Sequence, residues 1–150
     1  MQNIDVLDRQ ILEVLSSDVK KSYAEMAKMF NVSTGTIHIR IEKLRQAGVI
    51  QEMTIKLDER KLGFDVCSFI GITLKRAKDY GGVIKQLESI DEVIEAYYTT
   101  GTYGIFIKVM THSMEELHQV LTRKIQAIDE IQSTETLVSM QNPIRRNIKI

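Results

Sequence analysis

The stretch from Ser22 to Gln46 constrains the fold of this chain most, because it holds two short amphipathic helical patterns separated by only three residues. The first pattern opens with Ser22 and Glu25, which have the spacing of a capping box, in which each side chain satisfies a backbone N–H of the other residue. The second begins near Ser33, a favourable N-cap, and repeats apolar residues at helical spacing: Ile37, Ile41 and Leu44. Two helices joined this tightly predict a helix-turn-helix.

The other side of the second helix is polar and basic, as expected of a helix that enters the major groove of DNA. Between Ser33 and Gln46, three cations stand against one acid. Hydroxyl side chains at the start of a helix suit phosphate, and the guanidinium of Arg40 has the fork geometry that pairs with guanine. A surface helix also carries Arg and Lys for solubility alone, so this alternative stays open for each residue. The predicted DNA-contacting residues are Ser33, Thr34, Thr36, His38, Arg40 and Lys43.

A further amphipathic pattern precedes this pair and predicts a helix over residues 4–17. With helices over 22–30 and 34–46, it predicts a compact trihelical unit. Gly48 follows the third helix, where a glycine suits a left-handed C′ position. Residues 51–57 then alternate between polar and apolar, which predicts a hinge strand beside a winged helix-turn-helix. The charge cluster at 58–61 marks the predicted domain boundary, giving a DNA-binding domain over 1–61.

The second half, residues 62–150, alternates strand and helix patterns. Their order, β-α-β-β-α-β, is that of the ferredoxin-like split motif, so the predicted fold class is α+β. Such a sheet has helices on one face only, and a second copy of the chain is the simplest cover for the other face. We therefore expect a homodimer formed through this domain. The predicted strands are 66–75, 93–99, 103–110 and 133–140, and the predicted helices are 79–89 and 113–125.

The charge balance bears on how such a protein meets DNA. The net charge is zero, with 20 Lys and Arg and 20 Asp and Glu. Residues 1–61 carry ten cations against nine acids, and residues 62–150 carry ten against eleven. DNA binding requires a basic face and not a basic protein, but one copy this weakly basic would bind poorly. The balance therefore favours several copies acting together.

Several classes of function find no support in the sequence. No apolar run reaches the ~18–20 residues of a membrane span. The single cysteine, Cys67, excludes an internal disulfide and fits the cytoplasm, the expected location. His112 and His118 are six residues apart, the wrong spacing for two metal ligands on one helix face. With no phosphate-binding loop or dinucleotide fingerprint either, we expect no enzyme activity, metal or cofactor.

Four sequence segments together resemble the Lrp/AsnC family of transcription regulators. They are Leu7-Asp8-Arg9-Gln-Ile11-Leu12, the recognition-helix pattern from Ser33 to Leu44, Leu62-Gly63-Phe64-Asp65, and Thr99-Thr100-Gly101-Thr102-Tyr103. The similarity covers essentially the whole chain and is strongest to the asparagine-responsive members of the family. It implies a regulator that binds double-stranded DNA, assembles from homodimers into rings, commonly octamers, and responds to a small amino acid, here L-asparagine.

The resemblance also implies where the effector binds. In the family, the ligand lies between the loop around Gly101 and the final strand region of a neighbouring subunit. The family's loop often carries an acid where Thr102 and Gly104 stand here, so the effector's ammonium group would need backbone carbonyls or Glu135 instead. The alternatives are an ordinary hairpin turn at this loop, an amino-acid-binding module without DNA, and a DNA-wrapping protein without an effector. The implied ligand residues are Tyr98, Thr99, Thr100, Gly101, Thr102, Tyr103, Gly104, Thr122, Gln132, Ser133, Thr134 and Thr136.

Overall fold

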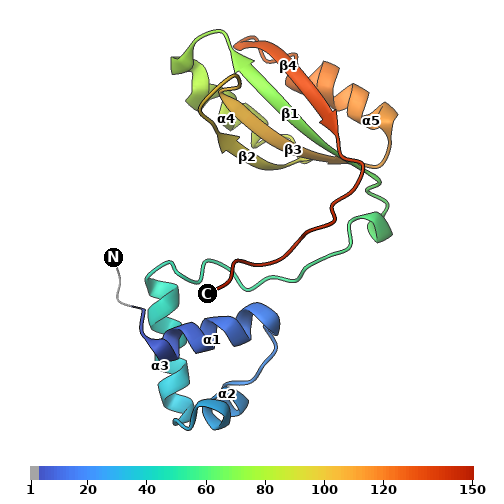
Figure 1. Cartoon of the computed structure of the whole chain (residues 1–150). Coiled ribbons are helices and arrows are strands. Elements are labelled where there is room, and N and C mark those ends of the chain that lie inside the picture. Colours follow the sequence, from blue (N-terminus) through green and yellow to red (C-terminus); the bar gives the residue numbers. More distant parts are fainter. Residues whose placement is uncertain (1–3) are drawn as a thin grey trace. The chain divides into compact units, whose positions relative to one another are not determined.

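The computed structural model describes residues 4–150, which form two compact units (Figure 1). The first unit runs up to Lys56 and also includes Ile144–Ile150, and the second is Leu57–Pro143. The chain therefore leaves the first unit once, builds the second, and returns to the first with its last seven residues.

Three helices form the first unit: α1 (Val6–Ser17), α2 (Tyr23–Phe30) and α3 (Thr34–Gln46). These bounds confirm the three predicted helices to within two residues. Their shared core is small, with five buried apolar residues, Ile11, Met26, Ala27, Ile37 and Ile41. Each fully buried Ile contributes about 1.5–3 kcal/mol. Partly buried apolar side chains, among them Leu7, Phe30 and Ile50, pack against these five residues and extend the core.

The expected strand at 51–57 is absent from the structure, and this prediction was wrong for the single chain. The segment is exposed throughout and has no strand alongside it among residues 4–150. Alternation gives a segment the side-chain pattern of a strand, but the ladder hydrogen bonds must come from a neighbour. For the same reason, residues 4–150 form no wing beside the helices. Gly48 does adopt the predicted left-handed conformation, with φ +70°.

A four-stranded antiparallel sheet forms the second unit, with strand order β2-β3-β1-β4. This is the predicted β-α-β-β-α-β order, so the ferredoxin-like fold is confirmed. Two short 3₁₀ turns, Arg60–Leu62 and Ala77–Asp79, precede β1 and α4, and a π-helical turn, Val120–Ile125, continues α5. The main elements are β1 (Val66–Leu74), α4 (Tyr80–Leu87), β2 (Val93–Tyr98), β3 (Ile105–Thr111), α5 (Met114–Gln119) and β4 (Ile131–Val138).

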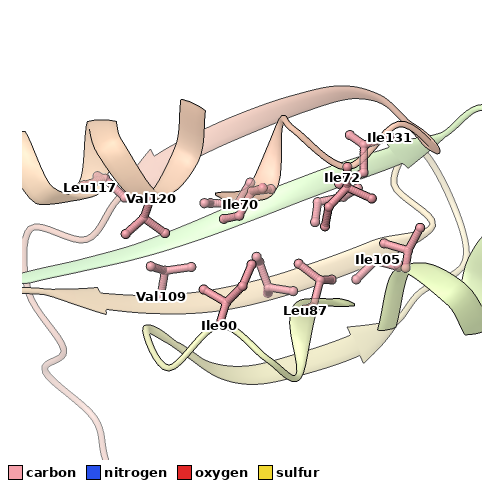
Figure 2. Packing of buried hydrophobic residues seen from close by; sticks show 13 residues of the cluster. Ile70, Ile72, Leu87, Ile90, Ile105, Val109, Leu117, Val120 and Ile131 are labelled. Atoms are coloured by element: carbon pink, nitrogen blue, oxygen red, sulfur yellow. The ribbon is translucent and has the colours of Figure 1, made fainter. Parts of the chain in front are cut away.

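Both helices pack on one face of this sheet, as Figure 2 shows for the buried side chains. Ile70 and Ile72 of β1 lie within the core, and Leu87 from α4 and Leu117 from the first turns of α5 pack against the same cluster. Successive strand residues point to opposite faces, so β1 places Phe69 and Gly71 on the face without helices. The side chains of β1 thus alternate between the hydrophobic core and the face that no helix of this unit covers, which we call the open face.

Candidate DNA interface and effector site

Two helix caps and one left-handed turn residue define the ends of α2 and the start of α3. Ser22 and Glu25 form the predicted capping box, with the Glu25 N–H donating to Ser22 Oγ at 3.2 Å and the Ser22 N–H to Glu25 Oε2 at 3.0 Å. Asn31 then takes a left-handed conformation, φ 53°, which ends α2. Ser33 Oγ accepts the Thr36 N–H at 3.0 Å and caps α3. These contacts all lie between Ser22 and Thr36, a stretch of fifteen residues.

Helix α3 buries one side and exposes the other. Ile37, Ile41 and Leu44 are at most 3% exposed. Of the predicted DNA-contacting residues, Thr34, His38 and Lys43 are exposed along the helix, and Ser33 and Thr36 share a hydroxyl–hydroxyl hydrogen bond of 2.8 Å at its start. The first helical bond runs from the Ile37 N–H to Ser33 O, and Ser33 Oγ takes the Thr36 N–H, so the N–H groups of Thr34 and Gly35 are left without an acceptor inside the helix, as in a phosphate site.

Ile39 is a residue that the sequence argument missed. It is a large apolar side chain, yet it lies on the outward side of α3 and is 67% exposed. An apolar group at this position of a recognition helix is suited to contact the thymine methyl in the major groove. The signal was available, since Ile39 stands two residues from both Ile37 and Ile41 and so falls opposite the buried stripe.

Arg40 is engaged inside the unit. Its guanidinium donates to the Asp5 carboxylate and, at 3.2 Å, to Asp8 Oδ1, so it ties α3 to the start of α1. Asp5 and Asp8 also cap α1 reciprocally, with N–H to carboxylate distances of 2.9 and 3.2 Å. The Asp8 N–H hydrogen bond and then the guanidinium of Arg40 lower the pKa of Asp5. Both hydrogen bonds use Nη1, so two carboxylates inside the unit compete with guanine for this guanidinium.

His38 also has a partner within the unit. Its ring meets that of Tyr23 on α2 edge to face, with centroids 5.9 Å apart. Near the end of α3, Arg45 pairs with Glu42 at 3.0 Å. Thr34, Ile39 and Lys43 are therefore the predicted or newly identified positions whose side chains are exposed and have no hydrogen bond, ion pair or ring contact with another of residues 4–150.

The hairpin loop between β2 and β3 is anchored at its base and exposed at its tip. The Thr99 N–H donates to Gly104 O at 3.2 Å, and Thr99 Oγ1 donates to Tyr103 O at 2.6 Å. At the tip, Thr100, Gly101 and Thr102 are exposed, and Gly101 has φ +120°, a conformation that favours glycine. Tyr98, which leads into the loop, is exposed and packs against Tyr80, with centroids 4.6 Å apart.

Tyr103 ties this loop across the open face of the sheet. Its ring lies over Gly71, where an added Cβ would come within 2.6 Å of the ring. Its hydroxyl donates to Glu135 on β4, and this hydrogen bond raises the pKa of Tyr103. The Gly104 N–H donates to Ile72 O at 3.0 Å, which holds the loop's end against β1. A carboxylate is thus linked to the loop, although the loop itself has none.

The remaining predicted ligand residues lie along β4 and the helix beside it. Ser133 pairs with Thr73, whereas Thr134 and Thr136 pair with Ile72 and Ile70, and so fall on the helix-covered face or its edge. Gln126, which was not predicted, donates its side-chain amide to Thr134 Oγ1 at 2.9 Å. Thr122 and Gln132 are exposed, and the Thr122 hydroxyl donates to His118 O within its own helix at 2.7 Å.

The predicted ligand residues therefore form two groups in one chain. The loop group, Tyr98–Gly104, reaches β4 on the open face through the Tyr103–Glu135 contact. The group of Thr122, Thr134 and Thr136 lies at the outer edge of β4, with β1 between it and the hairpin strands. Among residues 4–150, no cluster of three or more His, Cys, Asp or Glu could hold a metal, and no helix is long and apolar enough to cross a membrane.

A helix-turn-helix unit joined to a ferredoxin-like unit with a polar hairpin loop defines a class of two-domain, ligand-responsive DNA-binding regulators. Family models agree with this assignment. The AsnC-type helix-turn-helix domain matches residues 4–45, and the Lrp/AsnC ligand binding domain matches residues 67–148. The chain belongs to the Lrp/AsnC family. It is a DNA-binding transcription regulator that a small amino acid modulates, and it is not an enzyme.

Similar proteins cover almost the entire chain. It is 68% identical to the regulatory protein AsnC of Haemophilus influenzae over 149 residues, covering 99% of both chains. It is 60% identical to the regulatory protein AsnC of Escherichia coli strain K12 over 146 residues, covering 97% of this chain and 96% of that protein. The structure of E. coli AsnC superimposes with a TM-score of 0.95 at 58% identity, covering 99% of this chain and all of the other.

Proposed function

We propose that L-asparagine is the effector of this regulator. The observation that carries the proposal is the hairpin loop Thr99–Gly104, which combines exposed hydroxyls and a left-handed glycine in six residues and is linked through Tyr103 to the Glu135 carboxylate on β4. Asparagine needs donors for its carboxylate, acceptors for its ammonium group, and both for its amide. Glycine lets backbone N–H groups approach a carboxylate closely.

Glu135 supplies the acceptor for the ammonium group in this proposal. The loop carries no acid at Thr102 or Gly104, but the Tyr103 hydroxyl connects it to Glu135. Thr122, Gln132, Ser133, Thr134 and Thr136 complete the site from the β4 edge of a neighbouring subunit. Two subunits enter the proposal because, within one chain, the loop reaches the open face of the sheet through Tyr103, whereas Thr134 and Thr136 pair with Ile72 and Ile70 of the helix-covered face.

We also propose that the regulator is a homodimer that assembles further to an octamer, and that it acts in the cytoplasm, where a transcription regulator meets the chromosome. The open face of the sheet supports the dimer. It carries the stacked rings of Phe69 and Phe106, 6.0 Å apart, and the half-exposed Tyr97 and Leu137. A sheet face this apolar favours burial against another surface.

DNA recognition is assigned to α3. Thr34 and the helix start contact phosphate, together with Ser33 and Thr36, and Lys43 contacts phosphate further along. His38 and Ile39 face base edges, the latter through thymine methyl groups. Arg40 holds α3 in place from the carboxylates at the start of α1 and is the least available of the six predicted residues.

One experiment tests the effector and the DNA site together. Binding of the full chain to promoter DNA from its own genomic neighbourhood is measured by fluorescence anisotropy at fixed salt, with and without L-asparagine. We expect L-asparagine to shift the apparent Kd on promoter DNA, and L-aspartate, which lacks the amide donors, to leave it unchanged. Calorimetry with Glu135→Gln should then show weaker asparagine binding.

Two results would contradict the proposal. An apparent Kd that no amino acid changes would indicate a DNA-wrapping protein without an effector. Asparagine binding without any preference for promoter DNA over random DNA would indicate an amino-acid-binding module.

A further inference from the structure

The last seven residues of the chain are part of the unit that carries the recognition helix. Ile144–Ile150 group with residues up to Lys56, although the whole second unit separates the two segments in sequence. The Asn147 side-chain amide donates to Ser16 O near the end of α1 at 2.9 Å. Lys56 Nζ donates to Arg145 O at 3.2 Å. The tail is thus anchored at two points on the helix-turn-helix unit.

This placement changes the charge of the DNA-binding unit. Residues 1–56 carry eight Lys and Arg against seven Asp and Glu, a net charge of +1. The tail adds Arg145, Arg146 and Lys149 and no acid, which raises the unit to +4. The second unit, residues 57–143, carries nine cations against thirteen acids, or −4. The neutral chain is therefore a basic unit joined to an acidic one.

The basic tail also lies beside a further cation of the first unit, Lys56. Lys56 reaches the main-chain carbonyl of Arg145, so its ammonium group sits beside a segment that carries two consecutive arginines. Arg146 and Lys149 are exposed. Like charges held close together repel one another, and a polyanion relieves that repulsion on binding. The polyanion that a recognition-helix unit meets is the DNA backbone.

We propose that the tail Ile144–Ile150 is a phosphate-contacting element of the DNA-binding unit, with Arg146 and Lys149 as its contacting cations. The proposal rests on the DNA-binding function given above and extends the interface beyond α3. Contacts to phosphate carry no sequence information and release counterions, so they strengthen binding to any duplex and increase its salt dependence. The tail would supply affinity, and α3 would supply sequence preference.

The test variant is the full-length double variant Arg146→Gln/Lys149→Gln. Its binding is measured by fluorescence anisotropy on promoter DNA and on random duplex of the same length, between about 50 and 200 mM KCl, a range over which phosphate contacts make affinity strongly salt-dependent. We expect affinity to fall by a similar factor on both duplexes. The slope of log K against log[salt] should decrease by about 0.9 for each lost contact, or about 1.8 for the two cations of each bound tail.

The matched control is Lys78→Gln/Lys85→Gln, which removes the same charge from exposed positions of the second unit. This variant should keep the wild-type slope. A tail variant with the wild-type slope would overturn the proposal, and so would equal decreases in both variants, since these would reflect net charge and not the tail. Wild-type chain that binds neither duplex would instead contradict the DNA-binding function itself. Circular dichroism of both variants checks that they remain folded.

Discussion

Replacing Arg40 by alanine distinguishes its two possible roles. The sequence predicts a side chain that pairs with guanine, whereas the structure shows a guanidinium bound to Asp5 and Asp8. A base-reading arginine can be removed with little effect on the stability of the free protein. An arginine that joins α3 to α1 cannot, because its removal leaves a buried carboxylate behind.

The size of the effect follows from the burial of Asp8, which is 2% exposed. Without Arg40, its carboxylate keeps one donor described here, the Asp5 N–H at 3.2 Å. Removing one member of a fully buried ion pair costs about 3–5 kcal/mol, and a hydrogen bond to a charged group contributes about 1.5–3 kcal/mol. Because the Arg40 side chain is itself 30% exposed, the lower range applies, and we expect Arg40→Ala to cost about 2 kcal/mol.

Hydrogen exchange of the α3 amides measures this loss within the helix-turn-helix unit. A decrease of about 2 kcal/mol corresponds to roughly thirtyfold faster exchange at Ile37 and Ile41. Arg45→Ala is the matched control, since the exposed Arg45–Glu42 pair should contribute less than about 1 kcal/mol. Adding Asp8→Asn to Arg40→Ala should recover part of the loss. If Arg40→Ala exchanged like Arg45→Ala and lost binding only to promoter DNA, the positioning role would be refuted.

Three further predictions concern stability and the effector loop. The pKa of Asp5 is lowered in the folded state, so Asp5 contributes to the free energy of unfolding above its ordinary pKa of 3.8, and this contribution is lost as the pH falls from there through the folded-state pKa. The stability of Asp5→Asn should therefore depend less steeply on pH in acid unfolding than that of the wild type. Ser68→Ala should leave the melting temperature unchanged or raise it, because the buried Ser68 hydroxyl has no hydrogen-bond partner among the described residues; a decrease would reveal one. Gly71→Ala should displace the Tyr103 ring and lower the free energy of unfolding by about 1–3 kcal/mol, measured by thermal unfolding. It should also weaken asparagine binding in calorimetry; unchanged binding would show that Tyr103 is not part of the effector site.

Local signals explain why so much of the fold could be predicted from the sequence. The three helices of the first unit begin at capping residues and bury apolar stripes that recur at helical spacing. A cap joins residues about three apart, and an apolar stripe repeats every three or four residues, so both can be recognised in a short stretch of sequence. The β-α-β-β-α-β order follows in the same way from alternation and turn residues. The strand expected at 51–57 failed because its hydrogen-bond partner is not encoded in its own pattern.

For the candidate sites too, local features could be predicted from the sequence, whereas contacts between distant residues could not. The sequence identified α3 and the loop around Gly101, since hydroxyls, cations and glycines mark them locally. It did not show that Arg40 is bound to Asp5, 35 residues away, or that Tyr103 reaches Glu135, 32 residues away. Such pairs are set by how elements pack, and no spacing along the chain reveals them.

By itself, the sequence determined a helix-turn-helix followed by a ferredoxin-like domain, a total charge of zero, and the faces of its helices. Only the tertiary structure decided where that charge resides. By returning Ile144–Ile150 to the helix-turn-helix unit, it gives that unit a charge of +4 and leaves −4 on the other. Periodicity is a property of neighbouring residues, whereas the electrostatic field around a recognition helix depends on every charge that the fold brings near it.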